Sequence, residues 1–184
     1  GDIQPDWTGG LTLDLKYKFI SLSTLFDAKK GGSIYSMTTT WGRYSGVLQE
    51  TLLGRETGIV GEGVMNIGAS DAPNYVANDI VVRAESYNKA AYSNAIAEGS
   101  VFDASFVKLR QVVLTFDLPN KWFDHNIFQG ASVGVVGRNL AILHRNTPHI
   151  DPETGFSSLN SEQGQEFGQL PSTRSIGFNL NFNF

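Results

Sequence analysis

The sequence predicts an all-β protein built of antiparallel transmembrane β-strands, and three observations support this class. Residues 176–184 alternate apolar side chains with small or polar ones up to the final aromatic residue. Aromatic residues make up 11% of the 184 residues, whereas charged residues make up only 17%. The chain has no apolar run long enough for a membrane helix, so alternating strands are the one route by which it could cross a bilayer.

The alternation at the end of the chain gives the closing strand two different faces. Successive side chains of a strand point to opposite sides, so one side is apolar and the other carries Gly177 and three asparagines. Such a strand suits lipid on one side and a wet lumen on the other. A β-sandwich that binds carbohydrate is the alternative, and it would bury the apolar row against a second sheet. This row consists of Ile176, Phe178, Leu180, Phe182 and Phe184.

Four more segments of barrel-spanning length precede the closing strand. The apolar phase changes at Phe19–Ile20, which predicts a tight turn between the first two segments. In the third segment the phase shifts between Leu109 and Val112, which predicts a β-bulge near Arg110. The five predicted strands cover residues 8–19, 20–28, 101–118, 130–145 and 171–184.

Two long stretches without alternation separate these strands, at residues 40–100 and 146–170. Both exceed ordinary loop lengths, so they are expected to be extracellular loops, the first with a short helix within residues 85–97. About five strands cannot close an even-numbered barrel. The chain is therefore expected to be the C-terminal part of a larger barrel.

Composition excludes several other classes of protein. A net charge of −4 provides no basic surface, which argues against nucleic-acid binding. The absence of cysteine removes disulfides, thiolate zinc sites and cysteine nucleophiles together. No signal peptide opens the chain although an outer-membrane protein must be exported, so residue 1 is not expected to be the natural start.

Seven short blocks of the sequence carry a resemblance to a known family. The blocks are residues 5–10, 26–27, 30–35, 103–110, 137–140, 151–153, and 168–169 with 171–175. In this order they resemble the C-terminal barrel region of the SusC/RagA family. The resemblance implies a plugged 22-stranded barrel of a TonB-linked transporter in a Bacteroidetes-type cell outer membrane. Residues 1–184 would then be the C-terminal segment of a TonB-dependent-receptor-like barrel, embedded in outer-membrane lipid.

The resemblance also implies partners and cargo. The transporter would import glycans or peptides with a SusD-like surface lipoprotein as its lid, and TonB would bind an N-terminal part that these residues do not include. By the same resemblance, Phe184 would be the recognition signal for the barrel assembly machinery. The alternative role for Phe184 is one more aromatic anchor at the lipid interface. No cofactor, no metal and no enzymatic activity are expected.

Aromatic and amide side chains of the first long loop form the most plausible ligand surface. Aromatic faces stack on sugars, amides hydrogen-bond to hydroxyls, and Tyr and Trp also favour partner interfaces. The alternative is that these side chains pack the loop against itself. The candidates for ligand or partner contact are Trp41, Tyr44, Asn74, Tyr75, Tyr87, Asn88 and Tyr92.

Three further patterns are weaker. Residues 130–134 match the Gly-x-Ser-x-Gly nucleophile motif around Ser132, but no helical pattern follows, as a hydrolase would require. A glycoside hydrolase would need a pair of carboxylates in one cleft, and nothing in the sequence nominates such a pair. Four potential metal ligands in one loop match no recognised spacing and favour a solvated loop: His144, His149, Asp151 and Glu153.

Overall fold

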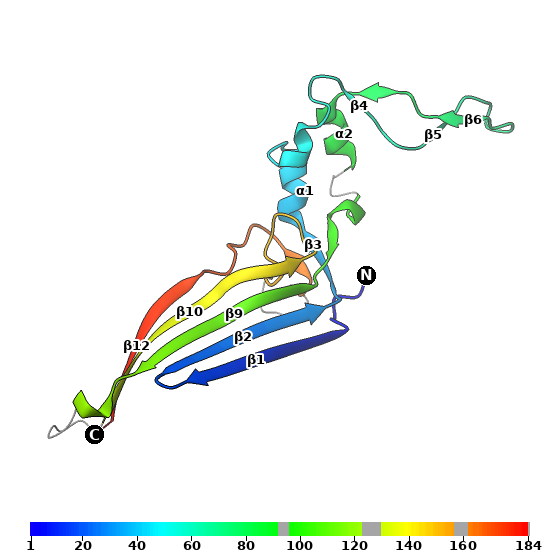
Figure 1. Ribbon diagram of the computed structural model, residues 1–184. Coiled ribbons are helices and arrows are strands. Elements are labelled where there is room, and N and C mark those ends of the chain that lie inside the picture. Colours follow the sequence, from blue (N-terminus) through cyan, green and yellow to red (C-terminus); the bar gives the residue numbers. More distant parts are fainter. Residues whose placement is uncertain (92–95, 123–129, 157–161, 184) are drawn as a thin grey trace. The chain divides into compact units, whose positions relative to one another are not determined.

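The computed structural model describes residues 1–91, 96–122, 130–156 and 162–183. Five long strands form one antiparallel sheet in the order β1-β2-β9-β10-β12 (Figure 1). They are β1 (Trp7–Tyr17), β2 (Ile20–Lys30), β9 (Phe106–Asp117), β10 (Gly130–Arg145) and β12 (Ser175–Asn183). Each of the five segments predicted to be strands overlaps one of them, and the third is divided into β8 (Val101–Asp103) and β9.

A two-residue turn joins β1 to β2. Tyr17 is paired with Ile20, and the register continues without a shift to Trp7 and Lys30. Lys18 has a positive φ of 52°, in the left-handed region that tight turns use. The tight turn that the phase change predicted is confirmed.

The register places apolar residues of all five strands in continuous rows on one face. Residues directly opposite each other in antiparallel strands share a face and contact each other, so each row extends across the sheet. One row is Leu15, Leu22, Leu114, Val135 and Phe178, and the next is Tyr17, Ile20, Phe116, Val133 and Leu180.

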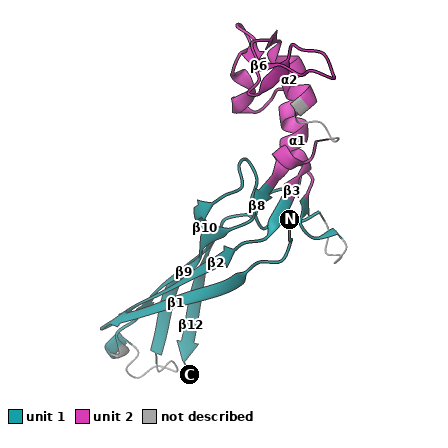
Figure 2. Ribbon diagram, turned by 90° about the vertical axis from the view of Figure 1, so that its right-hand side faces the viewer, with its two compact units in different colours: residues 1–34, 102–165, 169–184 teal, residues 35–101, 166–168 magenta. Residues whose placement is uncertain are grey.

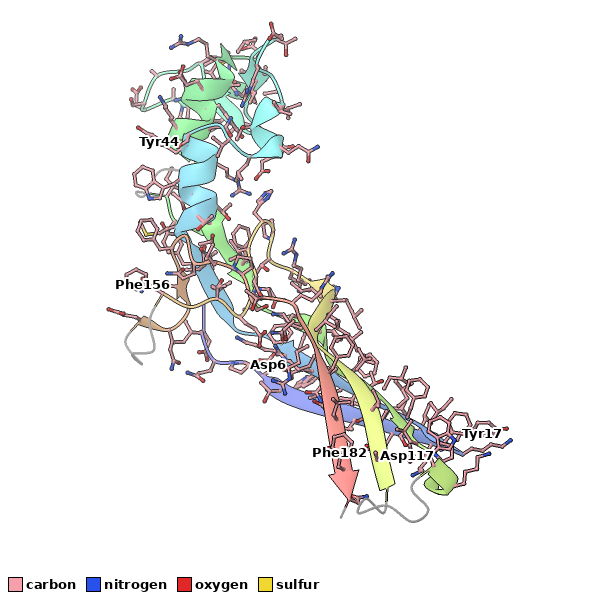
Figure 3. All side chains as sticks on the ribbon, turned by 90° about the vertical axis from the view of Figure 1, so that its left-hand side faces the viewer. Asp6, Tyr17, Tyr44, Asp117, Phe156 and Phe182 are labelled. Carbon is pink, nitrogen blue, oxygen red and sulfur yellow. The ribbon has the colours of Figure 1, made fainter. Side chains whose placement is uncertain are left out.

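The opposite face is polar over the same strands. Lys16 Nζ lies 3.2 Å from the Asp117 carboxylate, at the end of the sheet where Figure 3 shows Asp117 and Tyr17. The Asn181 amide donates to Ser132 Oγ over 3.3 Å. Ser132 lies inside β10, which continues to Arg145, so it is not at the strand-to-helix turn of a hydrolase. A row across this face is Lys16, Ser21, Thr115, Gly134 and Asn179.

A β-bulge lies at Arg110, as the phase shift predicted. Gln111 and Leu109 are paired with consecutive residues of β2, so no residue of β2 lies opposite Arg110 in the register. On the other side, β10 places two residues, Asn139 and Leu140, opposite Arg110. Asn139 has a φ of 50°, a conformation that Asn tolerates better than most residues.

The apolar row of β12 is exposed in the part of the chain that the structure describes. Phe178 is 77% exposed and Leu180 is 63% exposed. Figure 3 labels Phe182, which belongs to the same row. A sandwich would bury these side chains under a second sheet, so their exposure counts against the sandwich alternative.

The chain divides into two compact units (Figure 2). Unit 1 contains residues 1–34, 102–165 and 169–184, and unit 2 contains residues 35–101 and 166–168. In unit 1, Ile34, Ala104 and Ile150 form a small buried cluster against Phe102. Unit 1 also contains η3 (Asn120–Trp122), a short 3₁₀ helix.

Unit 2 contains regular elements where the sequence predicted a surface excursion. Its helix α2 (Ala84–Ala91) overlaps the expected helix, whereas α1 (Met37–Tyr44) was not predicted. Among the described residues, no helix has both the length and the apolar character needed to cross a membrane. The shorter elements of the chain are β3 (Ser33–Ser36), η1 (Gln49–Leu52), β4 (Ile59–Val60), β5 (Val64–Asn66), β6 (Tyr75–Ala77), β7 (Val81–Val82), η2 (Glu98–Ser100) and β11 (Gln165–Glu166).

The start of α1 explains why this helix forms in a sequence rich in threonine. Ser36 is the N-cap, and its hydroxyl accepts a hydrogen bond from the Thr39 backbone N–H over 3.0 Å. The same hydroxyl donates to the buried Glu166 carboxylate over 2.7 Å, and the Thr38 hydroxyl donates to the other carboxylate oxygen. A carboxylate at a helix N-terminus is favoured by the helix dipole.

Candidate functional site

Two of the predicted ligand residues lie together on α1. The rings of Trp41 and Tyr44 meet edge to face, with centroids 5.5 Å apart and an interplanar angle of 76°. Both side chains are exposed, and Figure 3 shows Tyr44 on α1. Trp41 lines a shallow apolar surface of unit 2 together with Val47 and Phe167.

A cleft of about 610 Å³ in unit 2 contains two of the predicted residues, Tyr44 and Asn88. The cleft lies between the end of α1 and the start of α2, with residues 45–55 completing its wall. Its charged lining was not predicted from the sequence. The charged residues are Arg43, Arg55, Arg83, Glu85 and Lys89.

Three other predicted residues do not line this cleft. The backbone N–H of Asn74 donates to the Asn66 side chain over 2.9 Å, and the exposed Tyr75 follows it in β6. The Tyr87 ring packs over Gly61, where an added Cβ would lie 3.2 Å from the ring. The two remaining candidates, Tyr92 and Phe184, lie outside the described residues.

An ion pair between the first and last turns of α2 sets the protonation of the cleft's acidic residue. Lys89 Nζ donates to Glu85 over 2.7 Å, one helical turn away. This hydrogen bond, aided by the charge of Lys89, lowers the pKa of the Glu85 carboxyl and raises the pKa of the Lys89 ammonium. Both groups are therefore charged at neutral pH.

A second charged cluster lies in unit 1 and contains Asp151 and Glu153, for which the sequence favoured a solvated loop over a metal site. Asp151 is instead buried. Lys108 is buried and donates to both Asp151 and Glu153. Arg110 donates to both Glu153 oxygens, over 2.9 and 2.7 Å, and also to Asp27. The two acids are therefore held by cations of the protein, and among the described residues no three potential ligands gather around a metal position.

The surroundings of the two acids keep them ionised. Burial raises the pKa of Asp151, but hydrogen bonds from Lys108 and Ser172 outweigh it and lower that pKa to about 2. For Glu153, burial likewise raises the pKa, and the bonds from Arg110 and Lys108 reverse the direction and lower it. The cluster is thus a network of ion pairs that fastens the segment after β10 to the polar face of the sheet.

This network draws its members from five of the seven sequence blocks. Asn139 accepts from Arg110 over 3.2 Å, and Ser172 donates its hydroxyl to Asp151 over 2.5 Å. The blocks are far apart in the sequence, and no local pattern could have brought them together. The five contributing blocks are residues 26–27, 103–110, 137–140, 151–153 and 171–175.

Comparison with curated proteins finds a relative of the same kind that the blocks indicate. TonB-dependent receptor P3 of Formosa agariphila is 27% identical over 189 residues, which covers 100% of this chain. The chain spans 17% of the length of that receptor. No family model matches the sequence.

Solved structures share the fold. The RagAB peptide importer in the closed-closed state aligns with a TM-score of 0.67 and 21% identity, covering 99% of this chain and 18% of that one. In the open-open state the TM-score is 0.57 with 22% identity, over 99% of this chain and 17% of that one. The resemblance to a SusC/RagA-type TonB-dependent transporter is confirmed. The curated relative is named a receptor, and the solved structures are those of a peptide importer.

Proposed function

We propose that this chain forms the C-terminal strands of a 22-stranded barrel in an outer-membrane TonB-dependent importer. In this proposal, the apolar rows of the sheet face lipid and the polar rows line the lumen. The carrying observation is that every one of the five strands contributes an apolar residue to the same two rows. Strands of 9 to 16 residues suit a tilted bilayer crossing.

The proposed importer takes up peptides or glycans together with a SusD-like lipoprotein. The similar solved structures are those of a peptide importer, which supports the uptake of peptides. Residues 40–100 and 146–170 would be its extracellular segments, with the cleft and Trp41 available to substrate or lid. TonB would bind outside these residues, and the barrel assembly machinery would recognise Phe184.

The facing of β12 tests this proposal through two neighbouring substitutions in the complete transporter. Leu180→Arg places a charge on the proposed lipid side and should destabilise the barrel by roughly 2 to 4 kcal/mol near the midplane. Asn181→Arg places the same charge in the proposed lumen and should be tolerated. The measurement is the yield of folded, heat-modifiable transporter in isolated outer membranes.

The comparison of the two variants contains its own control, because both introduce arginine on the same strand. A normal yield for Asn181→Arg with a severe loss for Leu180→Arg supports the facing. Equal yields for the two variants, or recovery of the protein in the soluble fraction, would contradict it.

A further inference from the structure

The cleft of unit 2 concentrates positive charge, although the net charge of the chain is −4. Four of its described lining side chains are cationic, and Glu85 is the one acidic residue among the described lining residues. A volume of about 610 Å³ lies within the range of roughly 300–1,000 Å³ that small-molecule sites occupy. The cleft is therefore large enough for a ligand and carries an excess of positive charge.

Arg55 is held in place by the protein but keeps free donors. Its Nε donates to the Thr51 carbonyl over 3.0 Å, and its Nη2 donates to the Thr51 hydroxyl over 3.2 Å and to the Gly46 carbonyl. No described residue accepts from Nη1. These bonds fix the guanidinium before any ligand arrives, which reduces the entropy cost of binding.

Arg83 supplies a second set of free donors. It immediately precedes α2, is exposed, and donates no hydrogen bond to a described residue. Arg43 differs, because its Nε donates to Glu50 over 3.1 Å and its Nη1 donates to the Gly99 carbonyl. Arg55 and Arg83 are therefore the two guanidinium groups of the cleft that can take a ligand.

Two neutral residues that line the same cleft, Asn88 and Tyr44, complete the site. The Asn88 amide donates to the Ala84 carbonyl over 2.8 Å, which leaves its oxygen, unpaired in the described chain, as an acceptor. The exposed Tyr44 ring lies 5.4 Å from Lys89 Nζ and offers a flat apolar wall. A ligand with an anionic group, a hydrogen-bond donor and an apolar surface would find a counterpart for each.

We propose that this cleft binds the carboxylate of an anionic ligand, with Arg83 and Arg55 as its charged donors. The planar guanidinium matches a carboxylate through two parallel hydrogen bonds, which also selects against neutral analogues. The carboxylate comes from either an acidic oligopeptide or a uronic-acid oligosaccharide. As a substrate site, the cleft rests on the proposed function, because that function places unit 2 on the path of imported molecules.

Calorimetric titration of the complete transporter in detergent tests the site. The probes are tetra-aspartate, its neutral counterpart tetra-asparagine, and trigalacturonate. Arg83→Gln should weaken binding of the acidic probe by about tenfold or more, since a hydrogen bond to a charged group is lost. The matched control is Arg174→Gln, which removes an exposed arginine of unit 1 and should leave the affinity unchanged.

The outcomes separate the two sources and the two proposals. Binding of tetra-aspartate alone assigns the carboxylate to peptides, and binding of trigalacturonate alone assigns it to glycans. Binding of tetra-aspartate and tetra-asparagine with equal, measurable affinity, no binding of either acidic probe, or no effect of Arg83→Gln would overturn the inference. Because heat-modifiable folding of each variant is measured in parallel, loss of binding in a correctly inserted barrel leaves the proposed function standing.

Discussion

Replacing Lys108 by methionine should release the segment that follows β10. The side chains of Lys108 and Asp151 are each only 2% exposed, and their charged atoms are 2.5 Å apart. In the variant, Asp151 keeps hydrogen bonds from Ser172 but loses its cation, whereas Glu153 keeps Arg110. The loss of stability in the variant therefore comes mainly from one buried carboxylate, that of Asp151, which is left without a cation.

Two estimates of that cost agree in order of magnitude. The fall in the pKa of Asp151 from 3.8 to about 2 corresponds to roughly 2 kcal/mol of net stabilisation of its charged form. Removing one partner of a buried ion pair typically costs about 3–5 kcal/mol. We expect Lys108→Met to lower the free energy of local opening by roughly 2 to 5 kcal/mol.

Hydrogen exchange read by mass spectrometry of the complete transporter measures this local opening. Peptides covering residues 146–156 should lose protection in Lys108→Met. The matched control is Lys16→Met, which removes an exposed ion pair to Asp117 and should change protection by less than about 1 kcal/mol. Adding Asp151→Asn to Lys108→Met should restore part of the protection, because the uncompensated charge is gone.

Two results would refute this reasoning. One is equal protection of residues 146–156 in Lys108→Met and Lys16→Met. The other is a double variant, Lys108→Met with Asp151→Asn, whose cost is the sum of the two single costs within about 0.5 kcal/mol. Either result would mean that the buried pair does not fasten this segment.

Acid should loosen the same segment. A carboxyl group whose pKa in the folded state lies below its ordinary pKa stabilises the fold at pH values above the ordinary pKa, and this stabilisation is lost as the pH falls through the folded-state pKa. Pepsin cleavage within residues 146–156 should therefore rise between pH 4 and about 2, and an Asp151→Asn variant that shows the same rise would exclude Asp151 as the cause. At the bulge, Asn139→Val should cost about 1–3 kcal/mol because its φ is 50°. Asn139→Gly loses the same side-chain bonds without that strain and should melt at a higher temperature than Asn139→Val, so equal melting temperatures would count against backbone strain.

Alternation located the strands and the bulge because a sheet with one apolar and one polar face imposes a period of two that the sequence records directly. The shift from Leu109 to Val112 identified Arg110 for the same reason. An amphipathic strand is a local pattern, and its register to the neighbouring strand follows once the tight turn at Lys18 is known.

The helices of unit 2 could not be predicted from a local pattern in the same way. Helix α1 has three threonines in its first turn and depends on Ser36 and on Glu166, which is 130 residues from Ser36 in the sequence. The charged network was missed for a related reason, because Arg110 and Asp27 are 83 residues apart. Asn88 was selected as a ligand residue by type alone, and the structure uses its amide N–H to bond its own helix.

The order of the five-stranded sheet leaves β1 and β12 as its edges. Each edge presents a row of backbone N–H and C=O groups that no other described strand pairs, and such rows readily join strands of other molecules. In hydrocarbon the same unpaired groups are strongly unfavourable. These 184 residues are therefore expected to aggregate when they are produced alone. Biophysical measurements on them should use preparations in which neighbouring strands pair with both β1 and β12.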